Sequence, residues 1–277
     1  MKKIIISILF LVFYTMASAQ IKFANSSEIK TFLKSKTLVV LDEAPFSLFN
    51  ETLKAAMAKF WTITPYDFIT MEDFEKKNAG SSYSFIMLSE AQQKEDGVLC
   101  TYNFLNLILG GSSDINKMPD LGSVPLSYTE VDEETYLYKL GGILIFMQNH
   151  VIYASEHPSI VPKLINKDSG IDIKTKELWL LKDELPSNFN TIEKIKTVYP
   201  NTVKIVTKED IKKAIEDKNS KVVYLHKVGP NGTLVGGKCW KFLVTANEGE
   251  VLYYEGHKVD ASNQDAFLEK DFKSIAK

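Results

Sequence analysis

The sequence contains no arginine, so all 33 of its basic residues are lysines. Arginine is the usual bidentate partner of phosphate, carboxylate and guanine, and its absence removes that mode of recognition. The lysines are outnumbered by 35 acidic residues, which leaves a formal net charge of −2. A chain without a basic excess has no electrostatic attraction to nucleic acid. We therefore expect no nucleic-acid partner.

Residues that bind metals or carry out catalysis are also scarce. There are 2 cysteines and 4 histidines, and no C-x-x-C, H-E-x-x-H or G-x-S-x-G pattern occurs. Gly110-Gly-Ser-Ser113 follows a strand-like run as phosphate-binding loops do, but the lysine of such loops is missing. The acidic residues gather at expected helix starts and on exposed helix faces, where they complement the helix dipole. We expect no metal and no cofactor.

Long hydrophobic runs are absent except at the amino terminus. Lys2 and Lys3 precede an apolar run from Ile4 to Tyr14, and Ala17-Ser-Ala19 forms a small-residue cleavage site. This order predicts a cleaved signal peptide over residues 1–19, and hence a periplasmic or secreted protein. The run is shorter than the roughly 20 residues of a spanning helix, so no stable membrane insertion is expected after cleavage. The Ala-Gln end and the frequent Lys, Ile and Asn resemble envelope proteins of Bacteroidota-type bacteria.

What the mature chain does contain is an internal repeat of four blocks in the same order. The most specific match is a helix start, in which Thr70-Met-Glu-Asp73 corresponds to Thr207-Lys-Glu-Asp210. Each Thr can cap a helix, and each Asp suits the positive helix end. The other matched blocks are a buried strand, a hairpin, and a strand followed by a helix: 37–41 with 177–181, 83–105 with 222–244, and 124–148 with 251–276.

Each unit is predicted to run β-α-β-α-β-β-β-α. Strands joined through helices pair in parallel, whereas a hairpin adds antiparallel strands to the same sheet. The fold class is therefore α/β with an α+β tendency, in two similar units with mixed parallel and antiparallel sheets. The expected boundaries are 20–156 for the first unit, 157–176 for a linker with two prolines, and 177–277 for the second unit.

Cys100 and Cys239 occupy matching positions in the two hairpins, and three interpretations stay open. They can be buried strand residues without a chemical role, as free cysteines commonly are. They can form a disulfide, if the two units pack about a pseudo-two-fold axis that brings equivalent residues together. Third, Cys239 can be a nucleophile.

The third interpretation depends on a resemblance. Gly236-Gly-Lys-Cys-Trp240 resembles the Cys-Trp end of the papain-type nucleophile motif, which implies a thiol-dependent hydrolase using Cys239 with His226 or His257. The papain-type cysteine opens a helix, whereas Cys239 is predicted to begin a strand. The Cys-Gly pair that precedes that family's nucleophile is absent.

Aromatic residues concentrate on the later strands of both units. On an exposed sheet face they would form a binding platform for a protein, peptide or glycan, and on a buried face they belong to the core. We expect most of them to be core. The candidate binding residues are Tyr102, Tyr128, Trp240, Tyr253 and Tyr254.

The strand and helix order of one unit resembles small α/β domains of envelope-assembly proteins, namely the TolB amino-terminal domain and the periplasmic domain of the curli secretion channel. This resemblance implies an interaction role. Because the polar residues nearly all have structural explanations, the sequence favours an exported, non-enzymatic binding or scaffolding protein of the bacterial cell envelope. The partner would be an envelope protein, a peptide or a glycan, and the thiol hydrolase is the alternative.

Overall fold

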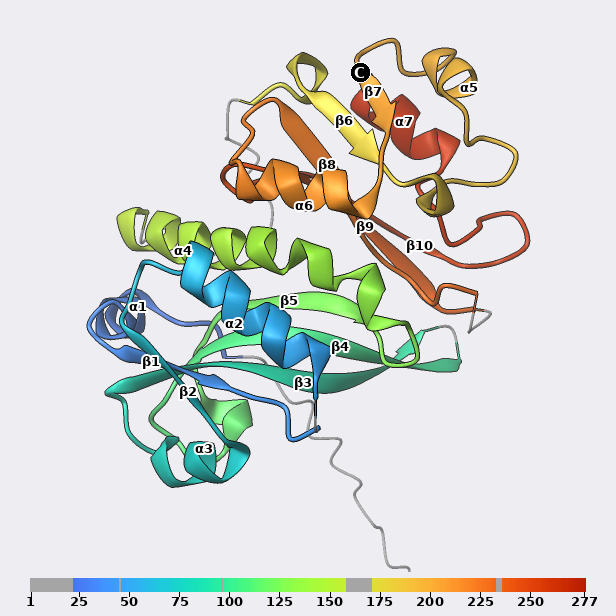
Figure 1. The fold of residues 1–277 in the computed structure, drawn as a ribbon. Coiled ribbons are helices and arrows are strands. Elements are labelled where there is room, and N and C mark those ends of the chain that lie inside the picture. The colour runs from blue at the N-terminus through green and yellow to red at the C-terminus, as the bar shows by residue number, and fades with distance from the viewer. Residues whose placement is uncertain (1–21, 45, 96, 158–170, 233–235) are drawn as a thin grey trace, which may run out of the picture.

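The computed structural model describes residues 22–44, 46–95, 97–157, 171–232 and 236–277. The predicted signal peptide and most of the predicted linker lie outside these ranges. Two five-stranded sheets are stacked with helices between and outside them (Figure 1). The prediction of an α/β fold with two similar units is confirmed.

The first unit contains sheet β2-β1-β3-β4-β5. An additional helix, α1, precedes the predicted pattern. The elements are α1 (Ser26–Phe32), β1 (Lys36–Val40), α2 (Leu48–Phe60), β2 (Tyr66–Ile69), α3 (Met71–Lys77), β3 (Tyr83–Glu95), β4 (Val98–Leu109), η1 (Ile115–Lys117), β5 (Asp120–Tyr128), η2 (Glu133–Thr135), η3 (Leu137–Lys139) and α4 (Leu140–Glu156).

The second unit contains sheet β7-β6-β8-β9-β10. In both sheets the first three strands of this spatial order run parallel to one another. The fourth strand pairs antiparallel with the third, and the fifth pairs antiparallel with the fourth. The elements are η4 (Ile173–Thr175), β6 (Glu177–Leu180), η5 (Lys182–Glu184), α5 (Ile192–Lys196), β7 (Val203–Ile205), α6 (Lys208–Glu216), β8 (Val222–Val228), β9 (Lys238–Thr245), β10 (Val251–Lys258) and α7 (Glu269–Ile275).

Both helix starts that match in sequence are capped by a side-chain hydrogen bond. The side chain of Thr70 accepts a hydrogen bond from the backbone of Asp73 at the start of α3, and Thr207 does the same with Asp210 at the start of α6. Asp210 also accepts from the backbone N–H of Thr207, which completes a capping box. The two helices therefore occupy the same place in the two units, between the second and third strands.

Each sheet has one face covered by a single helix, and its other face is covered by α1, α2 and α4 in the first unit and by α5 and α7 in the second. In the first unit Val39 packs with α2 and α4, whereas Leu38 and Val40 pack with Phe74 of α3. In the second unit Leu178 and Leu180 pack with α5 and α7, and the other face carries α6. Because successive strand residues point to opposite faces of a sheet, these clusters show which side chains of each strand lie on which face.

The two units stack head to tail. The face of the first sheet that carries α1, α2 and α4 packs on the face of the second sheet that carries α6, and both contribute to one continuous core. The layers run α3, first sheet, the helices α1, α2, α4 and α6, second sheet, then α5 and α7 (Figure 1). The pseudo-two-fold packing assumed for the disulfide is therefore wrong, because a two-fold axis would bring like faces together.

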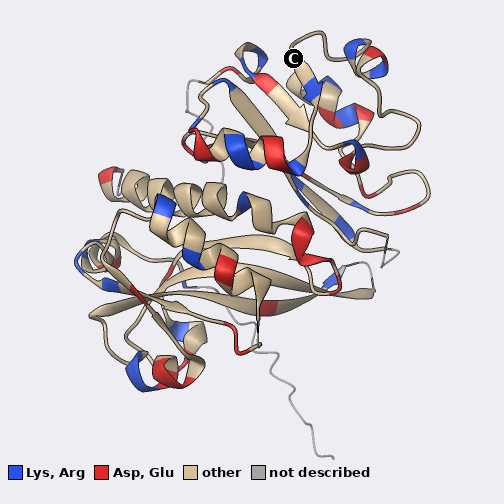
Figure 2. Ribbon diagram, viewed as in Figure 1, with Lys and Arg blue, Asp and Glu red and all other residues tan. Residues whose placement is uncertain are grey.

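Helix α4 lies in the middle of this stack and is apolar on almost all sides. Its sequence carries no charged residue before Glu156, and Figure 2 shows the contrast with α3 and α6. Two glycines at its start allow close packing on both sides. A methyl group at Gly141 would lie 2.5 Å from the ring of Phe60, and one at Gly142 would overlap the hydroxyl of Tyr224. Among the described helices, none is long and apolar enough to cross a membrane.

Candidate functional site

A pocket lies at the carboxyl edge of the parallel strands of the second unit. The chain leaves β6 through Leu181 and η5, enters α6 at Lys208, and leaves β8 at Gly229. Strands β6 and β8 are neighbours, and the chain goes from β6 to β7 on one side and from β8 to β9 on the other, so the connections after β6 and β8 leave in opposite directions. Open α/β sheets bind ligands at such a switch point.

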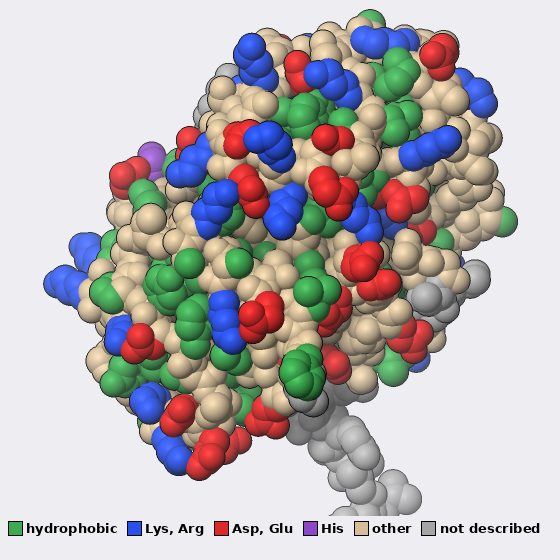
Figure 3. Space-filling model, in the orientation of Figure 1, with side chains coloured by type: hydrophobic (Ala, Val, Ile, Leu, Met, Phe, Trp, Pro, Cys, Tyr) green, Lys and Arg blue, Asp and Glu red, His purple; other side chains and the backbone are tan. Residues whose placement is uncertain are grey.

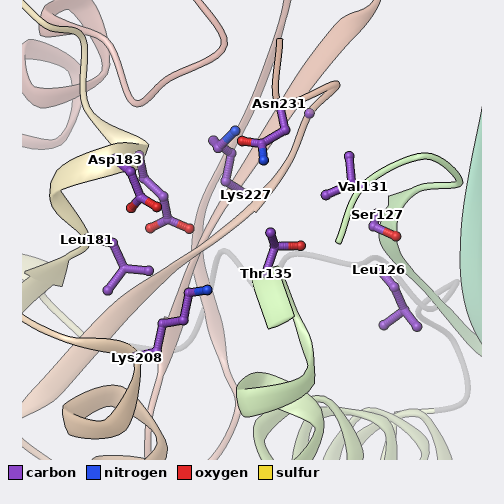
Figure 4. Close-up of a pocket in the computed structure, with 11 residues that line it drawn as sticks. Leu126, Ser127, Val131, Thr135, Leu181, Asp183, Lys208, Lys227 and Asn231 are labelled. Atoms are coloured by element: carbon purple, nitrogen blue, oxygen red, sulfur yellow. The ribbon is translucent and has the colours of Figure 1, made fainter. Parts of the chain in front are cut away.

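The first unit completes this hollow, which we call the junction pocket. About 450 Å³ of space lies among its lining residues, with the open solvent at its mouth included. Strand β5 and the η2 segment of the first unit form the wall opposite the second unit (Figure 4). The lining residues are Leu126, Ser127, Val131, Thr135, Leu181, Asp183, Glu184, Lys208, Lys227, Gly229 and Asn231.

One side of the junction pocket is a closed ion pair. The ammonium of Lys227 lies 2.8 Å from Oδ2 of Asp265, and the backbone N–H of Asn231 donates to the same oxygen at 2.7 Å. A methyl group at Gly229 would overlap the Asp265 carboxylate, so only glycine allows this close approach. Lys227 is therefore held in place.

A second ion pair joins the two units beneath the junction pocket. Nζ of Lys139, just before α4, lies 3.1 Å from Oε1 of Glu184 in η5, and both side chains are buried. The other carboxylate oxygen of Glu184, Oε2, is buried without a hydrogen-bond partner. A buried carboxylate needs both a counter-charge and hydrogen bonds, so half of this group lacks its partner.

Two further charged groups of the junction pocket have no such partner. Lys208 is the first residue of α6 and is half-buried, and Asp183 is exposed on η5. Neither forms an ion pair with any residue in the described ranges. In Figure 4 the amino group of Lys208 points into the space that Asp183, Thr135 and Lys227 surround.

The predicted aromatic residues do not form an exposed platform. Tyr102 and Tyr128 are buried, and the ring of Trp240 stacks on Tyr102 with centroids 4.7 Å apart. The Tyr128 hydroxyl donates to the carbonyl of Lys238 at 2.7 Å and accepts from its N–H at 2.8 Å. These residues join the two units, so the prediction of a binding face is wrong for Tyr102 and Tyr128.

The other two aromatic candidates differ from each other. Tyr253 packs against the outer core of the second unit and donates to Oδ1 of Asp271 at 2.8 Å. Only Tyr254 is well exposed, at 40%. A single exposed tyrosine makes no platform.

The two cysteines are free thiols. Cys100 packs with Tyr102, Tyr128 and Val228, where the first sheet meets the second unit. Cys239 alternates with Lys241 and Leu243, on the face that carries α5 and α7. Both side chains are fully buried.

The surroundings of Cys239 bear on the thiol-hydrolase alternative. His257 lies directly opposite Cys239 in the β9–β10 ladder, whereas His226 lies on the other face of the sheet with Phe242. Burial raises the pKa of the Cys239 thiol well above its ordinary value, and the nearby Asp265 carboxylate adds to this effect. A neutral thiol without solvent access is a poor nucleophile, and Cys239 does not line the junction pocket.

The two candidate histidines bind backbone carbonyls. Nε2 of His226 lies 2.8 Å from the carbonyl oxygen of Pro125 in the first unit, and Nε2 of His257 lies 2.8 Å from that of Gln264. Since a carbonyl only accepts, each Nε2 carries the proton. Within the described ranges, no three His, Cys, Asp or Glu side chains gather closely enough to hold a metal ion.

The charged residues of the junction pocket are not among the candidates that the sequence offers. Lys139 interrupts an apolar run, and such a lone lysine is the signal of a buried counter-charge. Glu184 and Lys208 carry no local signal, because their role depends on how the units stack.

Comparison of the chain with protein-family models, with curated proteins and with solved structures finds no match in any of the three. The resemblance to small envelope-assembly domains stays a prediction.

Proposed function

We propose that the chain is an exported, non-enzymatic binding protein of the bacterial cell envelope that holds its ligand in the junction pocket. The observation that carries this proposal is the place of the pocket, at the switch point of the second sheet and closed by residues of the first unit. The predicted signal peptide supports an extracytoplasmic ligand.

The duplication has a direct role in this proposal. A single unit would leave the carboxyl edge of β6 and β8 open, whereas the stacked first unit supplies Ser127, Val131 and Thr135 as the opposite wall. Ligand sites commonly lie between domains for this reason. The surface shown in Figure 3 intermixes both signs of charge, which favours a local site over a broad electrostatic docking face.

The proposal is tested by ligand-observed NMR of the mature protein against separate mixtures of amino acids, short peptides and oligosaccharides. Thr135→Trp fills the junction pocket from the first-unit side. Thr129→Trp, on the same connection but outside the pocket, is the matched control. We expect at least one mixture to contain a ligand whose binding is lost in Thr135→Trp and kept in Thr129→Trp. Binding that survives Thr135→Trp, or no binding from any mixture, would refute the proposal.

A further inference from the structure

We infer that the ligand of the junction pocket is a small aliphatic zwitterion of the α-amino-acid class, with its ammonium at Glu184 and Asp183 and its carboxylate at Lys208. This inference rests on the proposed function and adds the chemistry of the ligand. It depends on groups of the junction pocket that lack partners and on the character of its walls.

The ammonium end is assigned by Glu184. Lys139 satisfies Oε1 at 3.1 Å, but Oε2 is buried without a hydrogen-bond donor. Leaving such an oxygen unpaired is unfavourable, and an ammonium group brings three donors. Asp183 follows the same strand end and forms no ion pair in the described part of the chain, so it supplies a second acceptor near the mouth.

The carboxylate end is assigned by Lys208. Its ammonium forms no ion pair with Asp183 or Glu184, although all three line the same pocket. Lys227, the other cation of the lining, is already bound to Asp265 at 2.8 Å. Lys208 is thus the lining cation that is left to receive an anionic group.

The balance of charge favours a ligand that carries both signs. The junction pocket and its ion pairs contain the cations Lys139, Lys208 and Lys227 and the anions Asp183, Glu184 and Asp265. Three charges of each sign cancel, so a purely cationic or anionic ligand would leave one group unmatched. A zwitterion pairs both free groups and brings no net charge into a half-enclosed site.

The apolar part of the wall selects against sugars. It consists of the aliphatic side chains of Leu126, Val131 and Leu181, and no aromatic residue of the described ranges lines the pocket. Aromatic rings are the usual apolar partner where a flat ligand face must be covered. Aliphatic walls suit a branched alkyl side chain.

The test is isothermal titration calorimetry of the mature protein with L-leucine, leucinamide, N-acetyl-leucine, Leu-Gly-Gly and chitobiose. Leucinamide lacks the carboxylate and N-acetyl-leucine lacks the ammonium. We expect L-leucine to bind about ten- to a hundredfold more tightly than either, as expected for one charged hydrogen-bonded contact. Tighter binding of Leu-Gly-Gly than of L-leucine would place the carboxylate of the ligand elsewhere and overturn the inference.

The variants assign each end of the ligand. Lys208→Met should weaken L-leucine about ten- to a hundredfold and leave leucinamide unchanged. Lys212→Met, exposed on the same helix and outside the pocket, should change neither. Asp183→Asn should weaken L-leucine and leave N-acetyl-leucine unchanged. Equal losses for L-leucine and leucinamide in Lys208→Met would overturn the inference.

The experiments distinguish a failure of the proposed binding function from a failure of the proposed ligand class. If chitobiose binds and Thr135→Trp abolishes its binding while no amino acid binds, the ligand class is wrong and the binding function stands. If L-leucine binds equally to the parent and to Thr135→Trp, both proposals are wrong.

Discussion

The contact between α4 and the second sheet makes the stacking of the units testable through one methyl group. Replacing Gly142 by Ala places a Cβ that overlaps the hydroxyl oxygen of Tyr224 and lies 3.2 Å from its Cζ and 3.3 Å from Cδ1 of Ile215. Tyr224 is 1% exposed, so its ring has no free space to move into. In an isolated helix the same change would be favourable, because Ala exceeds Gly in helix propensity by about 1 kcal/mol.

The two effects oppose each other, and overpacking is the larger. Extra methyl groups in a packed core cost about 1–3 kcal/mol, so we expect Gly142→Ala to lower the free energy of unfolding by about 1–2 kcal/mol. In a Tyr224→Phe background the overlapping oxygen is gone. The remaining contacts need shifts of only a few tenths of an ångström, so Gly142→Ala should there be neutral or stabilising.

The assay is urea unfolding followed by tryptophan fluorescence and circular dichroism for the four members of the double-mutant cycle. A coupling of at least about 1 kcal/mol between the two positions is expected, with unchanged m-values. Gly80→Ala, where the nearest atom would lie at an ordinary 3.4 Å, is the control and should change stability little. If Gly142→Ala stabilises the protein, or if its effect is the same in the Tyr224→Phe background, then α4 and β8 do not approach as described.

Three further predictions concern buried groups. Cys100 and Cys239 are both fully buried, so native-state alkylation followed by intact mass should find two unmodified thiols, and rapid labelling of either would contradict this packing. Burial lowers the pKa of His226 to about 3; the unfolded state, with a pKa of about 6.5, then binds more protons, so stability should fall as pH drops from about 6.5 towards 3. His226→Gln should reduce the slope of the free energy of unfolding against pH, measured by urea titrations, by the contribution of one proton. An identical slope in this variant would show that His226 does not cause the pH dependence. Thr37 links Thr64 and Ser84 through hydroxyl contacts of 2.5 and 2.9 Å, so Thr37→Val should cost about 1–3 kcal/mol in the same assay, and no loss would show that these hydroxyls are satisfied elsewhere.

The order of the elements could be predicted from the sequence because it depends on local signals. The Thr-x-Glu-Asp strings mark two helix starts through interactions within one turn, and both caps form. Turn residues and apolar runs then separate the strands. Two copies of the same order predict two copies of the same sheet, and the strand orders agree.

The sheet face on which each strand side chain lies could not be predicted in the same way. Runs such as Leu38-Val-Val40 and Leu178-Trp-Leu180 are apolar on both sides, so they match equally well in two registers. A one-residue slip sends every side chain to the opposite face. Leu38 packs towards α3 whereas Leu178 packs towards α5 and α7, although the sequence comparison paired them.

The candidate site was missed because it belongs to neither unit alone. Lys139 is the one strong local signal, a lysine at the start of an apolar helix that must have a buried counter-charge. Its partner Glu184 lies 45 residues away in the other unit. The pairing depends on head-to-tail stacking, which periodicity within a unit does not encode.

Head-to-tail contacts between like units can repeat, and the polarity of the outer helices α3 and α7 opposes the docking of a further unit. Helix α4 is apolar towards both sheets, as an internal layer must be. Its counterpart α7 turns Lys270 and Lys273 outwards, and α3 carries exposed Lys76–Glu72 and Lys77–Asp73 ion pairs. Docking a third unit on either face would bury these charges, which is unfavourable. The junction pocket lies between β5 and η2 of the first unit and the carboxyl ends of the strands of the second unit, so the duplication supplies its two walls.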